Sequence, residues 1–156
     1  MTTPITIADM KGRVLLVVEK KGRLELDGVD LREANLEKAN IEGASCMGTN
    51  FAGSNLKGSD LYWLNAFEAN FANANLEGAH LHGADLKAAN FDGADLTNAD
   101  FRKDNLGGAT DLRAARLENA RITGATKFEG AIYSKTTTFP KGFHPEQRGM
   151  VLRDDA

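Results

Sequence analysis

The sequence repeats itself every five residues over most of its length, and this period limits the folds available to it. If the large apolar residue of each repeat is its centre, 17 centres run from Leu26 to Leu106, and 15 of them are Leu, Ile or Phe. Two residues before the centre, 13 of the 17 are Ala, Ser or Thr, and one residue before it, 14 are Asn or Asp. Neither the period of a helix nor that of a simple strand produces this pattern.

A five-residue period predicts a chain that turns a corner at each repeat, so that four corners close a square coil of 20 residues. Stacked coils would pair like strands, about 4.8 Å apart. The centre and the small residue two places before it would point inward, and the other three positions would face water. Glycine two places after many centres, as at Gly43 and Gly83, suits the positive φ of tight turns.

Residues 20 apart should form vertical columns inside such a coil. We expect phenylalanine rings that share a column to stack. Three core ladders are large and apolar throughout: Leu36, Leu56, Leu76 and Leu96; Leu31, Phe51, Phe71 and Phe91; Ile41, Leu61, Leu81 and Phe101. The fourth column reads Leu26, Cys46, Ala66 and Leu86. Ala66 is the smallest residue of this column, and Leu64 stands two places before it, where most repeats have a small residue. The large and the small residue have therefore exchanged positions in this repeat, which roughly conserves interior volume.

The A(D/N)LXX pattern resembles that of the pentapeptide-repeat proteins, and the resemblance covers residues 24 to 133. It implies an all-β fold, a right-handed quadrilateral β-helix with four repeats per coil and about five to six coils. The resemblance says little about function, because one fold hosts many roles.

The register changes after Leu106. It slips by one residue there and again later, and we expect a bulge at each extra residue. The centres that follow are Leu112, Leu117, Ile122, Phe128 and Tyr133. Asp104 falls at an inward position before the first slip. We expect its carboxylate to rotate outward or to accept hydrogen bonds from turn amides.

Both ends leave the repeat, and a solenoid needs caps at its ends. Residues 1–23 predict an N-terminal β cap, with a strand pair over 5–18 and a turn at Lys11 and Gly12. We expect residues 24–133 to form the β-helix and residues 134–156 to form an irregular C-terminal segment. Two roles are open for that segment: covering the last coil, or forming a two-fold homodimer contact. Its candidate side chains are Phe139, Phe143, Met150 and Val151.

Composition narrows the function classes. A net charge of −3 with 26% charged residues argues against a strongly basic nucleic-acid binder and against a charge-extended disordered chain. No apolar run approaches the roughly 20 residues of a membrane span, and no signal peptide is evident. The one cysteine, Cys46, forbids an internal disulfide. We expect a cytoplasmic protein that contacts neither membrane nor nucleic acid directly.

The sequence offers little for catalysis. It has no phosphate-binding loop, no paired-cysteine or zinc motif and no nucleophile elbow, and Cys46 sits at an inward position. Asp60, His80 and Asp100 share one outward column, where the carboxylates should favour protonated His80. Their spacing permits an ion, but nothing completes a closed ligand set. We therefore predict no catalytic residues, no metal and no cofactor.

One group of large, mostly aromatic side chains is expected to face outward, although the packing of a solenoid with polar outer faces does not require it. Exposed aromatic patches commonly mark binding surfaces. The predicted anchors are Met47, Tyr62, Trp63 and Phe67, with His80, His82 and Arg102 as polar neighbours. The hypothesis is a non-catalytic interaction or scaffolding module with an unknown protein partner.

The distribution of charge along the rod suggests an alternative function. Residues 24–100 hold 13 acidic and four basic groups, net −9, whereas the first 23 residues are net +3. The resemblance includes quinolone-resistance members, which bind DNA gyrase and topoisomerase IV as DNA mimics. Such an inhibitor or protector would compete for a basic groove. Against this reading, nine of the 17 pre-centre residues are Asn and only five are Asp, and no long projecting loop is expected.

Overall fold

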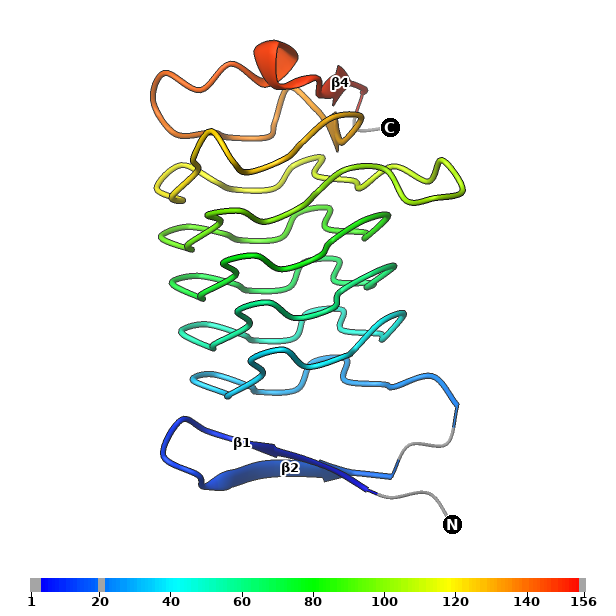
Figure 1. Ribbon diagram of the computed structural model, residues 1–156, viewed down its shortest axis with the longest axis vertical. Helices are drawn as coiled ribbons and strands as arrows, with labels where there is room; N and C mark the ends of the chain where they lie inside the picture. The colour runs from blue at the N-terminus through cyan, green and yellow to red at the C-terminus, as the bar shows by residue number, and fades with distance from the viewer. Residues whose placement is uncertain (1–3, 20–21, 155–156) are drawn as a thin grey trace.

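The computed structural model describes residues 4–19 and 22–154. The chain forms a β-helix solenoid in which successive coils stack between an N-terminal hairpin and a C-terminal segment (Figure 1). Within the described residues, we find no helix with the length and apolar character that crossing a bilayer requires.

The coils are held together by regular backbone pairing. Parallel bridges join residues 20 apart, from Glu25 with Ser45 up to His80 with Asp100. Each centre donates its N–H to the coil above, as Leu56 does to the carbonyl of Asn75 at 2.7 Å. The 20-residue step expected from the sequence is therefore the pairing step of this part of the chain.

The core consists of the predicted ladders. The rings of Phe51, Phe71 and Phe91 stack with centroids 5.0 Å apart and planes within 5° of parallel. Leu64 and Ala66 are both buried, so the expected exchange of a large and a small residue does fill the interior. Cys46 also packs inward, and burial raises the pKa of its thiol to about 12.

The Asn or Asp before each centre caps the turn that follows. The side-chain oxygen of Asn55, for example, accepts the backbone N–H of Lys57 at 3.1 Å, and that of Asp95 accepts the N–H of Thr97 at 3.0 Å. Short side chains with an acceptor oxygen make this local bond readily. The pre-centre preference therefore has a structural cause that Asn satisfies as well as Asp.

Phe101 is the last centre of the unbroken register, and the prediction that Leu106 is also a centre was wrong. Asp85 pairs with Asp111, so the step there is 26 residues rather than 20, and the next buried centre is Leu112. Leu106 is 82% exposed. Removing residues 103–108 would restore five-residue spacing from Phe101 to Leu112. We call these six residues the 103–108 loop; it projects from the rod (yellow-green in Figure 1), where only a one-residue bulge was expected.

The loop has a physical cause in its own residues. An Asp at an inward position would bury an uncompensated charge, which is costly. Asp104 instead lies in the loop, where its carboxylate accepts the N–H groups of Leu106 and Gly108 at 2.8 and 2.7 Å. Its predicted inward position was wrong, and the predicted satisfaction by turn amides is confirmed.

The centres predicted beyond the loop do lie in or against the core. Leu112, Leu117, Phe128 and Tyr133 are buried, and Ile122 is partly buried against the core. Phe128 stacks on Phe101 with centroids 5.0 Å apart. Coil pairing continues past the expected boundary at residue 133, because Thr138 pairs with Arg116.

The N-terminal cap is a hairpin of β1 (Ile5–Ala8) and β2 (Val14–Val18). The far end of β1 joins the first coil, where Asn35 donates its N–H to the carbonyl of Ala8 at 2.8 Å. Ile7 is buried beneath the core. Ile5 of β1 and Leu16 and Val18 of β2 also pack against the core, so one face of the hairpin covers this end of the coils.

The C-terminal segment contains β3 (Ile132–Tyr133), the 3₁₀ helix η1 (Pro145–Arg148) and β4 (Val151–Leu152), with β4 parallel to β3. Phe139, Phe143 and Met150 pack against the core as expected. Val151 does not cover the coil, because its side chain is exposed and it contributes a backbone bond to Ala131 instead.

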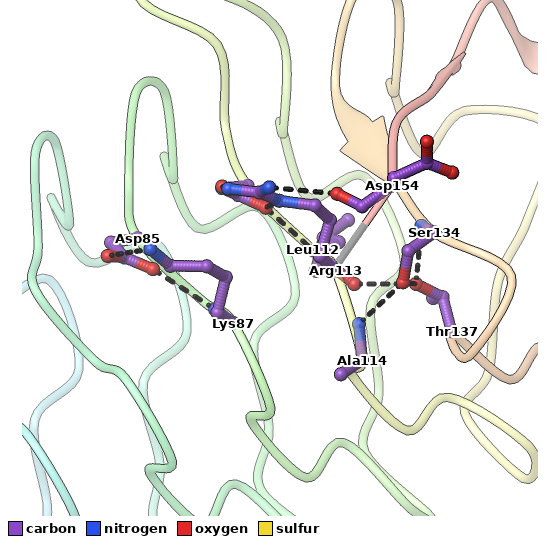
Figure 2. Close-up of polar contacts among 9 residues, drawn as sticks. Asp85, Lys87, Leu112, Arg113, Ala114, Ser134, Thr137 and Asp154 are labelled. Carbon is purple, nitrogen blue, oxygen red and sulfur yellow. Dashed lines mark hydrogen bonds and ion pairs between the residues drawn. The ribbon is translucent and has the colours of Figure 1, made fainter. Parts of the chain in front are cut away.

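Polar contacts fasten this segment to the coil beneath it (Figure 2). Arg113 donates to the backbone carbonyl of Asp154 at 3.0 Å. The hydroxyl of Ser134 accepts the N–H of Ala114 at 3.1 Å, and the hydroxyl of Thr137 donates to the carbonyl of Leu112 at 2.9 Å. These bonds pair backbone groups that the end of a solenoid would otherwise leave unmatched.

Candidate functional site

The 103–108 loop lies against one corner of the coil below it. The indole Nε1 of Trp63 donates a hydrogen bond to the carboxylate of Asp104 at 2.6 Å, and the ring of Tyr62 meets that of Trp63 edge-on. Gly83 makes room for this contact, since a Cβ there would lie 2.8 Å from both Trp63 Cδ1 and Asp104 Oδ2. The corner and the loop therefore form one unit.

Asp104 is the hub of this unit. The hydrogen bond from Trp63, followed by those from the backbone amides of the loop, holds the pKa of its carboxyl below the usual value. The charged form is thus the form that the loop and Trp63 recognise.

His82 links the aromatic corner to Asp100. The imidazole of His82 stacks on Tyr62 with ring centroids 4.5 Å apart, and its Nε2 lies 3.2 Å from Asp100 Oδ2. His82 is only 8% exposed. Burial is the main reason that its pKa is lowered, although the neighbouring Asp100 carboxylate opposes the shift.

Asp100 holds several cations at once. Arg102 binds it in a bidentate manner, with Nε 3.0 Å from Oδ1 and Nη2 2.8 Å from Oδ2, and Lys127 Nζ lies 3.9 Å away. Burial raises the pKa of Asp100, but the hydrogen bonds from Arg102 outweigh it, so the net pKa is lowered. Arg102 is therefore already paired with Asp100, and the carboxylate partly neutralises its positive charge.

The expected column of Asp60, His80 and Asp100 pairs through its backbone. The histidine that contacts Asp100 is His82, whereas His80 is exposed and its ring centroid lies 6.0 Å from that of His82. Among the residues that the structure describes, we find no group of three or more His, Cys, Asp or Glu side chains suited to a metal ion.

Two shallow depressions flank the corner, and the 103–108 loop forms a wall of both. One of about 420 Å³ is lined by Tyr62, His82, Arg102, Lys103, Asp104, Asn105 and Glu129. The other, of about 310 Å³, is lined by Glu42, Asp60, Tyr62, Trp63 and Asn105. The loop therefore contributes a wall to both depressions beside the predicted interaction surface.

The structure thus gathers five predicted site residues and separates two. Tyr62, Trp63, His80, His82 and Arg102 form the contacts described above. Met47 and Phe67 lie at the following corner in consecutive coils, where Gly48 donates its N–H to the carbonyl of Phe67 at 2.9 Å. Both side chains are exposed, at 42% and 38%.

Sequence reasoning missed the part that the loop plays. Lys103, Asp104, Asn105 and Glu129 line the larger depression, and none of them was expected in the site. A signal was present, because an Asp at an inward position is followed by the pair Gly107 and Gly108. A buried charge beside two adjacent glycines favours a loop over a continued coil.

Solved structures provide the comparison. The chain is 30% identical to alr5209, a pentapeptide repeat protein from Nostoc PCC 7120, covering 75% of this chain and 86% of that one, with a TM-score of 0.42. It is 28% identical to HetL, a pentapeptide repeat protein involved in heterocyst differentiation regulation from the same cyanobacterium. That match covers 85% of this chain and 59% of HetL, with a TM-score of 0.42.

A third structure is similar in fold alone. QnrB1, a plasmid-mediated fluoroquinolone resistance protein, is 14% identical over 85% of this chain and 88% of its own, with a TM-score of 0.52. No curated protein matches the chain.

The family assignment follows from the sequence matches. The sequence profile described as "Pentapeptide repeats" matches residues 30–63 and 67–102, in eight copies. These ranges coincide with the coils of uniform 20-residue pairing. Together with the 30% identity to alr5209, this match shows that the chain belongs to the pentapeptide-repeat family.

Proposed function

We propose that this chain is a non-catalytic protein-interaction module of the cytoplasm. It is a right-handed, four-sided rod of about five to six coils that presents a rigid surface to a protein partner. The partner's contact is the corner defined by Tyr62, Trp63 and the 103–108 loop, with Met47 and Phe67 adding an apolar margin at the next corner.

One observation carries the proposal. Trp63 is held in place by Tyr62 and by its hydrogen bond to Asp104, yet 41% of it stays exposed. A large aromatic side chain that is both ordered and accessible loses little entropy on binding, which makes it an effective anchor. The neighbouring depressions offer room for groups of the partner on either side of the indole.

The test compares partner capture by matched variants. The W63G/F67A variant removes both rings, and Gly suits position 63 because Gly43 and Gly83 occupy the same turn position in the neighbouring coils. E37A is the control, since Glu37 is an exposed turn residue on another side of the rod. Immobilised chains are compared by quantitative mass spectrometry of the retained proteins.

We expect W63G/F67A to retain at least about tenfold less of the partner than E37A and the unmodified chain, as loss of an aromatic anchor produces. Equal retention by all three chains, with unchanged circular dichroism, would exclude this corner as the binding surface.

A second candidate function is a DNA mimic that inhibits or protects DNA gyrase or topoisomerase IV. It is supported by the likeness in fold to QnrB1 and by the net charge of −9 over residues 24–100. An acidic rod would be steered to a basic DNA-binding groove. The test is a gyrase supercoiling assay at two salt concentrations. Inhibition that weakens with salt supports an inhibitor of this kind, and the absence of inhibition removes that role.

A further inference from the structure

The smaller depression beside the aromatic corner contains carboxylates but no cation. It has a volume of about 310 Å³, and its lining residues are Glu42, Asp60, Tyr62, Trp63 and Asn105. Among the described residues that line it, none is basic, whereas the larger depression is lined by both acidic and basic side chains. The smaller depression therefore complements a positive charge supplied from outside the chain.

Asp60 lacks the ion pair that comparable aspartates have. Six aspartates of the described coils precede a buried centre, and all but Asp60 pair with a cation: Asp30 with Arg32, Asp85 with Lys87, Asp95 with Arg121, Asp100 with Arg102, and Asp111 with Arg113. In four of these pairs the cation stands two residues after the Asp. In the repeat of Asp60 this position is Tyr62, whose backbone N–H donates to the carboxylate at 3.2 Å. An aromatic ring therefore stands where the cation would be.

Glu42 adds a second carboxylate in the neighbouring coil. Gly43 donates its N–H to the carbonyl of Tyr62 at 2.8 Å, so Glu42 and Tyr62 occupy one column in consecutive coils. Consecutive coils lie about 4.8 Å apart. Glu42 is exposed, and it has no ion pair with any residue that the structure describes. One cation can therefore reach both carboxylates.

Two aromatic rings supply further walls. The rings of Tyr62 and Trp63 stand at 84° to each other, with centroids 5.6 Å apart, and the bond to Asp104 holds the indole in place. A cation over an aromatic face is attracted by the ring, and an arginine guanidinium makes such contacts more often than an ammonium. Asn105 contributes an amide from the 103–108 loop. These walls suit a flat cation with several N–H donors.

We propose that this depression binds the guanidinium of an arginine side chain of the protein partner. The inference rests on the proposed function, since it names the chemistry that the partner presents to the corner. The guanidinium donates to Asp60 and Glu42 while its plane packs against an aromatic ring. A lysine ammonium is more strongly hydrated and has no plane to set against the ring, so it fits these walls less well.

The experiment titrates the full chain with small probes of known charge. N-acetyl-arginine amide is compared with N-acetyl-citrulline amide, which has nearly the same shape without the charge, and with N-acetyl-lysine amide. Binding is followed by the fluorescence of Trp63, the single tryptophan of the chain. The probes are taken to about 50 mM at constant ionic strength, because a single side chain binds weakly.

Two double variants remove the same amount of charge at different places. E42Q/D60N neutralises the depression, and Asn suits position 60 because Asn40 accepts the N–H of Glu42 in the same way, at 3.1 Å. D27N/E37Q is the matched control, since Asp27 and Glu37 are exposed and line neither depression. Circular dichroism checks that both variants fold.

We expect the arginine probe to bind the unmodified chain and D27N/E37Q at least about tenfold more tightly than it binds E42Q/D60N. The citrulline probe should bind the unmodified chain at least about tenfold more weakly than the arginine probe does. The absence of a saturable change with the arginine probe overturns the inference. Equally tight binding of the citrulline or the lysine probe also overturns it, as does equal weakening in both double variants.

Failure of this inference is distinct from failure of the proposed function. In the capture experiment, W63G/F67A would lose the partner while E42Q/D60N retained it fully. The corner would then be the binding surface, but the depression would not hold an arginine of the partner. Full retention by both variants would overturn the proposed function as well.

Discussion

Trp63 and Asp104 lie 41 residues apart in the sequence and meet through one hydrogen bond of 2.6 Å between the indole Nε1 and the carboxylate. This bond fastens the 103–108 loop to a residue two coils below it, across Gly83 of the intervening coil. Since Trp63 is the single tryptophan of the chain, its fluorescence reports on the bond directly.

The first prediction concerns pH. The pKa of Asp104 is lowered in the folded chain, so the contribution of its charge is present above the ordinary value of 3.8 and is lost as pH falls through the lower, folded pKa. We expect Trp63 fluorescence to change with a midpoint below 3.8 while far-UV circular dichroism stays constant. In D104N this transition should be absent, and a transition that persists there would assign it to another group.

The second prediction separates a steric clash from backbone strain. Gly43 and Gly83 both have φ of 66°, but a Cβ at Gly43 meets nothing within 4 Å, whereas at Gly83 it meets Trp63 and Asp104. G43A should cost about 1–2 kcal/mol of unfolding free energy through strain alone. G83A should cost more and should also shift Trp63 fluorescence. Equal costs in urea unfolding, with unchanged fluorescence, would show that Gly83 is not needed for the contact.

The third prediction tests the exchange in the core. Leu64 and Ala66 are both buried. In this repeat the large residue precedes the small one, whereas in most other repeats the small residue comes first. L64A should cost about 2–5 kcal/mol by leaving a cavity, and A66L about 1–3 kcal/mol by overpacking. The double variant L64A/A66L should lie within about 1 kcal/mol of the unmodified chain, because the volumes balance again. Additive losses in chemical denaturation would show that the two sites do not share one space.

The fourth prediction concerns His82. Its pKa is lowered in the folded chain, mainly by burial, so folding favours the neutral imidazole. Its contribution is therefore complete above the unfolded value of 6.5 and declines as pH falls below that value. Unfolding free energy should decrease between about pH 7.5 and pH 5.5, and H82Q should reduce this slope. A slope that is the same in H82Q would mean that His82 does not contribute to it.

The fifth prediction removes the loop. Deleting residues 103–108 leaves Phe101 and Leu112 five positions apart, with Thr110 at the inward position that it already occupies. We expect a folded chain whose thermal midpoint changes little, because the loop adds exposed residues rather than core. Its tryptophan should become more accessible to acrylamide. A shortened chain that fails to fold would show that the loop stabilises the rod.

The sequence by itself determined the repetitive part of this protein. A residue such as Leu56 can be assigned to the core from its register alone, because every coil repeats the same turn and the same pairing. The stack of Phe51, Phe71 and Phe91 and the exchange of Leu64 with Ala66 follow from that register as well. Local periodicity is enough wherever each coil contacts only its neighbours.

Only the tertiary structure decided what happens where the repeat breaks. By spacing, Leu106 looks like another centre, yet it is exposed, because Asp104 cannot be buried without its charge partners and leaves the coil. The bond from Asp104 to Trp63 spans two coils and has no periodic signature. In the same way, the pairing of His82 rather than His80 with Asp100 depends on side-chain packing around Tyr62, which column position does not specify.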